Sequence, residues 1–213
     1  MQILPAILAT SEEIYQEQIT KVIQSKLFDG DWIQIDLMDG KFVSNKSIDP
    51  DILIKYPNVF KKEIQLLVAD PASWVEKLSK IPVHRIVAPV EVGEGQISQF
   101  IQKTKAMHIQ VGLSLNLGTP IESLAPFMDI IDSVLVMSAE PGAQGREFSV
   151  AALEKIRQIK KRWNIQVGDD GGVNSKNSKA LQEAGVDYLA IGSGLLKGDF
   201  DENFKKIRRT LSA

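Results

Sequence analysis

The sequence predicts a (β/α)8 barrel, in which eight parallel strands form a closed ring and a helix follows each strand. Two observations support this prediction: short apolar runs alternate eight times with amphipathic stretches, and the runs are mostly continuous in Ile, Val and Leu. Strands that are covered by helices on one side and by a packed barrel on the other have this composition. The length of 213 residues lies near the short end of what such a barrel needs. A doubly wound open sheet is the alternative fold.

The predicted strands are spaced so that each leaves room for a connecting helix. They are Gln2–Leu8, Trp32–Leu37, Lys62–Leu67, Arg85–Val87, Gln110–Leu115, Ser133–Met137, Ile165–Gly168 and Tyr188–Ile191. Helical patterns are clearest at Ser11–Leu27, Gln96–Met107, Val150–Trp163 and Asn174–Ala184. Helix starts are predicted at the capping residues Ser11, Asp70, Thr119 and Asn174, and helix ends at Gly30 and Gly185. No linker interrupts the series, so residues 1–213 are predicted to form a single domain.

The composition is that of an ordinary globular protein, with 44% hydrophobic residues, 24% charged residues and a net charge of −2. This balance gives no reason to expect nucleic acid or a membrane as a partner. The N-terminus lacks the basic flank and the apolar length of a signal peptide, so the expected location is the cytoplasm. The absence of cysteine excludes disulfides, thiolate metal sites and thiol nucleophiles.

Polar residues on the inner face of the predicted barrel are candidates for chemistry, because such barrels work at the carboxyl ends of their strands. Side chains alternate along a strand, so Gln34, Asp36 and Met38 share the inner face of the second strand. Gln65 on the third strand and Asp170 after the seventh point the same way. A plug of mutually hydrogen-bonded side chains is the structural alternative, but two carboxylates in one barrel mouth repel unless something uses them.

Glycines after the last two strands predict an anion site. Gly171 and Gly172 follow the seventh strand, and Gly192 and Ser193 follow the eighth. Glycine lets backbone N–H groups approach a phosphate, and a short helix starting near Ser193 adds its positive end. Barrels of this kind often bind phosphate at these two loops. A third glycine-bearing loop, Pro141–Gly145, faces the same mouth.

Five motifs, taken together, resemble the ribulose-phosphate 3-epimerase family, in the family's order and spacing over nearly the whole chain. They are Met38-Asp39-Gly40, Asn116-x-x-Thr119-Pro120, Met137-Ser138-x-x-Pro141-Gly142, Asp170-Gly171-Gly172-Val173-Asn174 and Gly192-Ser193. The resemblance implies interconversion of D-ribulose 5-phosphate and D-xylulose 5-phosphate through an enediolate. One aspartate removes the proton at C3 and a second returns a proton to the opposite face. By position in the family's motifs these are Asp36 and Asp170.

The resemblance also implies which residues hold the substrate, a small sugar phosphate. Met38 and Met137 match methionines that line the reacting face. The phosphate site matches Gly171, Gly172, Gly192 and Ser193, and the loop that closes over the substrate contains Gly142, Ala143, Gln144 and Gly145. Relatives are often homo-oligomers, which leaves the oligomeric state of this chain open.

The chain departs from the family at the metal site. The family holds zinc, iron or manganese with two histidines and the two aspartates, but Gln34 and Gln65 stand at the histidine positions. These metals favour imidazole, so we expect metal binding to be weak or lost and predict no cofactor. The glutamine amides can instead donate hydrogen bonds to an enediolate oxygen or to sugar hydroxyls. The only histidines, His84 and His108, are expected at the opposite end of the barrel.

Three functions are compatible with these residues. A sugar-phosphate 3-epimerase is favoured, because both aspartates and the phosphate glycines are present. A non-catalytic sugar-phosphate-binding protein is the alternative that the missing histidines favour. The third is a decarboxylase or aldolase of the same phosphate-binding barrel group, whose members carry an Asp-x-Lys-x-x-Asp motif. The segment Asp36-Leu37-Met38-Asp39 has no lysine, which counts against the third function.

Overall fold

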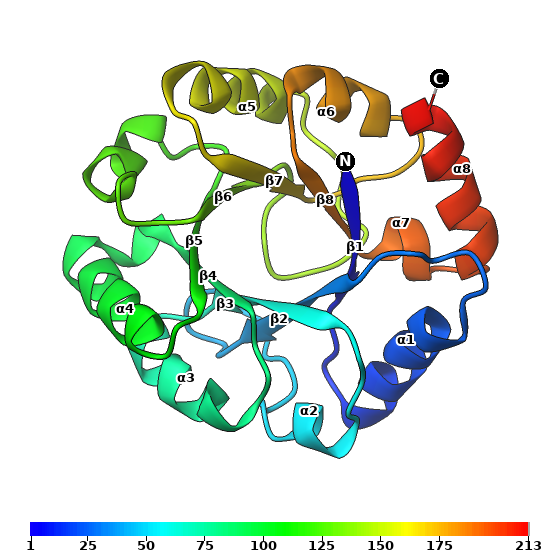
Figure 1. The fold of residues 1–213 in the computed structure, drawn as a ribbon, viewed down its shortest axis with the longest axis horizontal. Coiled ribbons are helices and arrows are strands. Elements are labelled where there is room, and N and C mark those ends of the chain that lie inside the picture. Colours follow the sequence, from blue (N-terminus) through cyan, green and yellow to red (C-terminus); the bar gives the residue numbers. More distant parts are fainter. Residues whose placement is uncertain (213) are drawn as a thin grey trace.

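The computed structural model describes residues 1–212 and shows the predicted (β/α)8 barrel (Figure 1). Strand β1 pairs in parallel with β8 over Gln2–Pro5, so the ring is closed and the open-sheet alternative is wrong. The strands are β1 (Gln2–Ile7), β2 (Trp32–Met38), β3 (Lys61–Leu67), β4 (Arg85–Pro89), β5 (Gln110–Leu115), β6 (Ser133–Met137), β7 (Gln166–Asp170) and β8 (Tyr188–Ile191).

Helices surround the strands in a ring, and the N-terminus lies inside this ring, beside β8 (Figure 1). They are α1 (Glu12–Gln24), α2 (Ile52–Lys55), α3 (Pro71–Lys77), α4 (Glu94–Ala106), α5 (Ala151–Arg162), α6 (Ser178–Ala184), α7 (Ser193–Leu196) and α8 (Phe200–Ser212), with 3-10 turns at Leu78–Lys80, Val90–Val92 and Ile121–Phe127. Among residues 1–212, no helix has both the length and the apolar character that crossing a bilayer requires.

The helix boundaries confirm three of the predicted signals. Ser11 caps α1 by accepting from the N–H of Ile14 at 3.3 Å, and Asp70 caps α3 by accepting from the N–H of Ser73 at 3.2 Å. Gly185 ends α6 with φ +96°, a left-handed conformation that glycine adopts without steric cost.

Three other boundary predictions are wrong. Helix α6 begins at Ser178, and Asn174 instead accepts from the N–H of Lys176 at 2.9 Å in the turn before it. Thr119 caps nothing, because its hydroxyl donates to Glu91 at 2.5 Å. Helix α1 ends at Gln24 and is capped there by Ser25, so Gly30 lies in the following connection.

The hydrophobic core lies between the barrel and its helices. Outward-facing strand residues such as Ile33, Ile35 and Leu37 are fully buried there. Inside the barrel the apolar cluster is small: it consists of Leu4, Val87, Leu135, Met137 and Tyr188. Buried polar side chains share the interior with this cluster, among them Gln34, Asp36, Glu63, Gln65 and Arg85, and they position the site.

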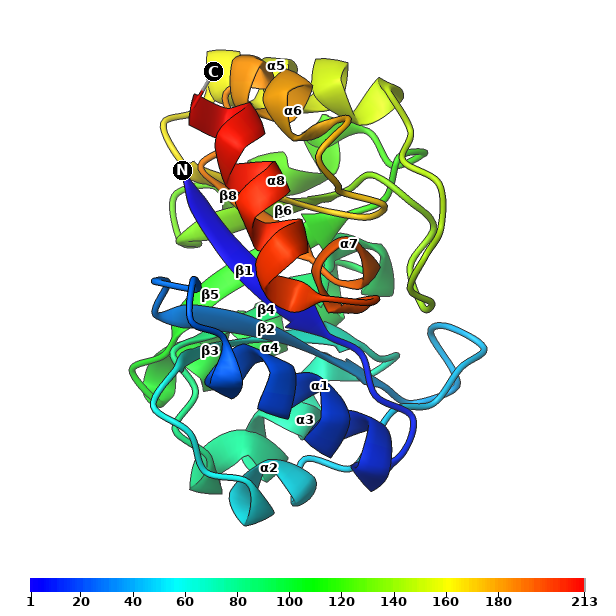
Figure 2. The same ribbon diagram turned by 90° about the vertical axis from the view of Figure 1, so that its right-hand side faces the viewer.

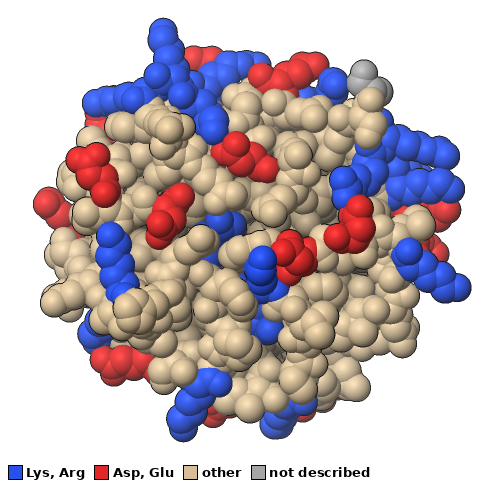
Figure 3. Space-filling view, viewed as in Figure 1, with Lys and Arg blue, Asp and Glu red and all other residues tan. Residues whose placement is uncertain are grey.

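The two ends of the barrel differ. In the side view, the loop after β2 and the loop between β6 and α5 project from the end opposite the N-terminus (Figure 2). This is the carboxyl end of the strands, where the candidate residues gather. On the face seen in Figure 3, which lies at the amino ends of the strands, Lys and Arg are interspersed with Asp and Glu around the rim. No single sign of charge covers that face.

Candidate active site

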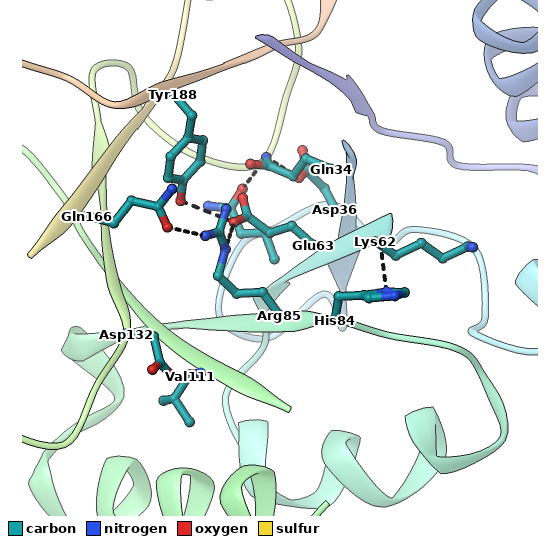
Figure 4. Close-up of polar contacts among 11 residues, drawn as sticks. Gln34, Asp36, Lys62, Glu63, His84, Arg85, Val111, Asp132, Gln166 and Tyr188 are labelled. Atoms are coloured by element: carbon teal, nitrogen blue, oxygen red, sulfur yellow. Dashed lines mark hydrogen bonds and ion pairs between the residues drawn. The ribbon is translucent and has the colours of Figure 1, made fainter. Parts of the chain in front are cut away.

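A buried ionic cluster forms the floor of the site. The Arg85 guanidinium donates to Glu63 and, at 2.7 Å, to Gln166, while the Tyr188 hydroxyl donates to Glu63 at 3.1 Å (Figure 4). The guanidinium also stacks between the rings of Trp32 and Tyr188, at 4.9 Å and 4.5 Å from their centroids. Because both ions are buried, each depends on the other for charge neutralisation.

Gly168 makes room for this cluster. A Cβ atom on Gly168 would lie 2.1 Å from a ring carbon of Tyr188, closer than any real contact. The absence of a side chain on β7 therefore lets the Tyr188 ring cross the barrel from β8 toward β3.

Above the floor, the two predicted acids face one another across the barrel. The amide nitrogen of Gln34 donates to Oδ1 of Asp36 at 2.9 Å and to Oδ2 of Asp170 at 3.1 Å. Register places Asp36 beside Gln65, with both side chains inside the barrel. The predicted convergence of these four side chains is present in the structure.

The side-chain amide of Gln65 lies beside the same two carboxylates, those of Asp36 and Asp170. With its oxygen inward, it accepts from Gln34 at 3.0 Å. With its nitrogen inward, it donates to Asp170 at 2.9 Å and to Asp36 at 3.1 Å. Two ionised carboxylates need donors, so the second orientation fits a fully ionised pair. The first orientation fits a pair with one proton, whose acid hydrogen can point to the Gln65 oxygen.

Burial and mutual repulsion keep protons on this pair. Burial, followed by the charge of Asp170, raises the pKa of Asp36 well above its usual range. Burial also raises the pKa of Asp170 to about 7, with the charge of Glu63 below adding to the effect. Since the two groups interact, the pair titrates as a unit. The pair therefore keeps a proton to higher pH than two exposed aspartates would.

A cavity of about 40 Å³ opens above the carboxylates. Asp36 and Asp170 both contribute to its wall, together with Leu67 and Met137. Gln34, Gln65 and Met38 are fully buried beneath it and do not reach the wall. The aspartates therefore face a cavity as well as one another, which argues against a plug with a purely structural role.

The glycine loops form the opposite wall. In residues 1–212, no carbonyl or side chain accepts a hydrogen bond from the N–H of Gly171, Gly172 or Gly192, and all three residues line the cavity. Ser193 lines it as well and begins the short helix α7, as predicted. Free N–H groups that converge on one cavity are what a phosphate requires.

Three loops pack too tightly here to tolerate side chains. A Cβ on Gly171 would lie 2.3 Å from the amide nitrogen of Ala139, and one on Gly172 would lie 2.6 Å from the carbonyl oxygen of Arg146. A Cβ on Gly192 would lie 2.6 Å from the Gln144 amide. Backbone contacts with the loop after β6 therefore require glycine at positions 171 and 172, whereas at Gly192 the Gln144 side chain would have to move.

The loop after β6 covers the cavity, as its predicted role requires. All four of its predicted residues, Gly142, Ala143, Gln144 and Gly145, line the wall. Gln144 donates to the carbonyl of Ala6 at the end of β1 at 2.9 Å, and Asn45 donates to the carbonyl of Gly142 at 2.8 Å. These two bonds tie the loop to the opposite side of the mouth.

The histidines lie away from the site. His84 and His108 are exposed and precede β4 and β5, at the amino ends of those strands. His84 accepts from the N–H of Lys62 at 3.4 Å, and His108 has φ +56° in a turn. Both are placed as the sequence predicts.

The residues present do not fit the metal of the family. The carboxylates of Asp36 and Asp170 converge on the amide N–H₂ of Gln34, which donates hydrogen bonds and does not ligate a cation. Zinc, iron and manganese favour imidazole in such sites. Residues 1–212 contain no cluster of three or more His, Cys, Asp or Glu that is placed to hold a metal ion.

Two buried polar residues beside the site were not singled out from the sequence. Asp169 is on the outer, helix-facing side of β7, and its Oδ2 lies within hydrogen-bond distance of the Ser138 hydroxyl, at 2.8 Å. Burial raises the pKa of Asp169 well above its usual range. A charged residue at a helix-covered strand position is the signal that could have identified it.

Comparison with solved structures shows the fold. The 3-hexulose-6-phosphate synthase of Salmonella typhimurium superposes with a TM-score of 0.75 at 17% identity, over 100% of this chain and 99% of that one. KGPDC of Streptococcus mutans, solved in complex with D-R5P, superposes with a TM-score of 0.74 at 10% identity, over 99% and 96% of the two chains. At such low identity the likeness shows a shared barrel alone.

Comparison of sequences is more specific. The chain is 31% identical over 172 residues to the cytoplasmic isoform of ribulose-phosphate 3-epimerase from Oryza sativa subsp. japonica, covering 78% of this chain and 75% of the rice protein. It is 27% identical over 207 residues to ribulose-phosphate 3-epimerase from Schizosaccharomyces pombe, covering 94% and 89%. The profile described as the ribulose-phosphate 3 epimerase family matches residues 2–196. With the barrel, the ordered motifs and these matches in agreement, the chain belongs to the ribulose-phosphate 3-epimerase family.

Proposed function

We propose that the protein is a sugar-phosphate 3-epimerase that acts on D-ribulose 5-phosphate or a similar ketose phosphate without a metal. Asp36 and Asp170 are its proton-transferring groups. The observation that supports the proposal is that these two carboxyl groups face one cavity and share the amide of Gln34. Two acids with perturbed pKa values in one cavity are typical of acid–base sites.

The shared proton suits the reaction. The carboxylate of Asp170, with a pKa of about 7, removes the C3 proton, and the electron pair moves onto the C2 carbonyl oxygen to give an enediolate. Neutral Asp36 then delivers its proton to the opposite face of C3. The proton of the pair ends on Asp170 rather than Asp36, which is the state that runs the reaction backward.

Gln34 and Gln65 hold the carboxylates in place. Because the Gln34 amide donates to both acids, it keeps two groups that repel one another within reach of one substrate. The oxyanion role expected for these amides has less support, since both are buried beneath the cavity wall and engaged with the carboxylates. We therefore assign both glutamines as positioning residues.

The phosphate lies on the free N–H groups of Gly171, Gly172 and Gly192 in this proposal. A cavity of about 40 Å³ holds only a few water molecules, so a ketose phosphate cannot enter while the loop after β6 is closed. Opening requires the Gln144–Ala6 and Asn45–Gly142 hydrogen bonds to break. Closure of the same loop then removes water from the enediolate.

A non-catalytic sugar-phosphate-binding protein is the second candidate. The observation in its favour is that Gln34 and Gln65 satisfy both carboxylates, so the four side chains form a closed network without a substrate. In that case the phosphate cradle binds a ligand, and no proton leaves C3.

The deciding experiment follows exchange of the C3 proton of D-ribulose 5-phosphate in heavy water by NMR. Protein treated with chelator is compared with the same protein after addition of zinc, manganese or iron. Exchange without metal is the expected result. Exchange only with added metal would contradict the metal-free mechanism, and phosphosugar binding without exchange under any condition would establish the second candidate.

A further inference from the structure

The loops after β6 and β7 are joined by buried side chains that the proton-transfer scheme does not use. The hydroxyl of Ser138 lies 2.8 Å from Oδ2 of Asp169 and donates to the carbonyl oxygen of Gly171 at 2.7 Å. Ser138 and Asp169 have no exposed surface. A carboxyl group in such a place is rare, because burial of a polar group without full hydrogen bonding is unfavourable.

We propose that Ser138, anchored by Asp169, positions the peptide group between Gly171 and Gly172 so that its N–H binds the phosphate of the substrate. This inference rests on the proposed function, because it concerns the phosphate end of the same cavity. Neither side chain touches the substrate, so both act as positioning residues.

The peptide geometry connects Ser138 to the cavity. In a trans peptide, the carbonyl of Gly171 and the N–H of Gly172 point in opposite directions. Ser138 holds the carbonyl, so the N–H of Gly172 points away from Ser138. That N–H has no acceptor within residues 1–212, and Gly172 lines the cavity. Ser138 therefore fixes the direction of a free donor at the cavity wall.

The segment needs such a constraint because two glycines in a row have large conformational freedom. Their φ angles are +133° for Gly171 and +64° for Gly172, which side chains disfavour. Contacts with Ala139 and Arg146 exclude a Cβ at either position, so a bulkier residue cannot supply the rigidity. A donor that is fixed before the anion arrives binds it more tightly, since less ordering accompanies binding.

Asp169 directs the hydroxyl. Burial raises the pKa of this carboxyl group well above its usual range, and its protonated form donates to Ser138 Oγ, which leaves the one Ser138 hydrogen for the Gly171 carbonyl. The Oδ2 of Asp169 contacts Ser138, while its Oδ1 has no hydrogen-bond partner among the described residues. Among the described residues, Ser138 is therefore the only hydrogen-bond partner of the Asp169 side chain. An asparagine in its place can donate its amide N–H to Ser138 Oγ and leave the hydroxyl hydrogen for Gly171. A valine leaves the hydroxyl free to rotate away.

The experiment measures binding of inorganic phosphate and of D-ribulose 5-phosphate to the full chain by calorimetry, together with the C3 exchange rate. Ser138→Ala is expected to lower the affinity for both ligands by about tenfold, which is the effect of one hydrogen bond to a charged group. KM should rise by a similar factor with kcat within about twofold, because the phosphate is bound equally in ground and transition states. Asp169→Asn should bind like the unmodified protein, and Asp169→Val like Ser138→Ala.

Ser178→Ala is the matched control, because Ser178 is equally buried and its hydroxyl has no partner among the described residues. It should change neither ligand affinity nor KM. The positioning role of Ser138 would be overturned if Ser138→Ala and Ser178→Ala lost phosphate affinity equally. It would also be overturned if Ser138→Ala bound phosphate as tightly as the unmodified protein. If the unmodified protein binds phosphate but exchanges no proton, the proposed reaction fails and phosphate binding alone decides the role of Ser138. If it binds neither ligand, both proposals fail.

Discussion

The amide nitrogen of Gln34, on β2, donates a hydrogen bond of 3.1 Å to Oδ2 of Asp170, on β7. This bond crosses the part of the barrel interior where, by the family resemblance, an imidazole and a carboxylate would share a metal. An amide nitrogen cannot ligate a cation, so the two strands are joined here by hydrogen bonding alone. Our expectations for metal binding, proton exchange and stability toward pH rest on this contact and on the proposed function.

Restoring both imidazoles should restore a metal site. Gln34→His combined with Gln65→His gives two imidazoles and two carboxylates, a donor set suited to zinc or manganese. The double variant is expected to retain about one metal ion per chain after dialysis, whereas the unmodified protein retains none, as measured by elemental analysis. His84→Gln removes an exposed imidazole far from the site and should change nothing. If the unmodified protein retained about one metal ion per chain, the inference that its residues do not fit the metal would be wrong.

Asp170→Asn should reduce C3 exchange by roughly 10²- to 10⁴-fold, the usual contribution of general acid–base catalysis. The amide keeps the shape of the carboxyl group, so D-ribulose 5-phosphate binding should persist and separate lost catalysis from lost binding. Asp129→Asn, at an exposed position, is the control and should exchange normally. Undiminished exchange in Asp170→Asn would remove Asp170 from the mechanism.

The same substitution should stabilise the protein at neutral pH. The pKa of Asp170 is about 7 in the folded protein, against an ordinary value of 3.8, so unfolding releases a proton between about pH 4 and pH 7. The stability of the folded state therefore falls as pH rises through this window. Asp170→Asn cannot lose stability in this way. At pH 8 the variant should be more stable than the unmodified protein by the order of 2 kcal/mol, or roughly 4–8 °C in Tm. At pH 4 the difference should be far smaller. Thermal unfolding followed across pH measures the difference; a constant difference would show that Asp170 ionises normally.

The strands were predictable because they are short, mostly continuous apolar runs separated by amphipathic stretches. Three strands match their predicted ranges, and β1, β2 and β3 differ by one residue at one end. Two differ by more: β4 continues to Pro89, and β7 runs over Gln166–Asp170 rather than ending at Gly168. The β7 change puts Asp170 on the strand itself, which fixes its side chain more firmly than a loop would. Alternation along β2 also predicted correctly that Gln34 and Asp36 point inward together.

Contacts between distant segments were not predictable from the sequence. Nothing local to Tyr188 shows that its hydroxyl reaches Glu63, because that contact depends on the missing side chain of Gly168 on a third strand. The bond from Gln144 to Ala6 likewise joins the sixth loop to the first strand. Periodicity reports which face a residue occupies, whereas the length and direction of a side chain across the barrel depend on packing.

Gly168→Ala should test the space that Tyr188 needs. The new Cβ would meet the Tyr188 ring at 2.1 Å, so the free energy of unfolding should fall by about 3 kcal/mol through overpacking. Combining it with Tyr188→Leu should lose less than the sum of the two single variants, because the clash disappears with the ring. Gly95→Ala in α4, where nothing lies within 4 Å of the new Cβ, should be neutral or stabilising by up to about 1 kcal/mol. If the losses in free energy of unfolding, measured with urea, were additive in the double variant, the close contact between position 168 and the Tyr188 ring would be contradicted.

Glu63→Gln should affect both stability and the pH dependence of exchange. The Arg85 guanidinium would lose its buried counter-charge, which is expected to lower the free energy of unfolding by about 3–5 kcal/mol. Asp31→Asn breaks the exposed pair with Lys61 and should have an effect below about 1 kcal/mol. Because the charge of Glu63 raises the pKa values of Asp36 and Asp170, its removal should lower both and move the rising limb of the exchange rate to lower pH. Reduced stability with an unchanged pH profile would show that the Glu63–Arg85 pair supports the barrel without influencing the carboxylates above it.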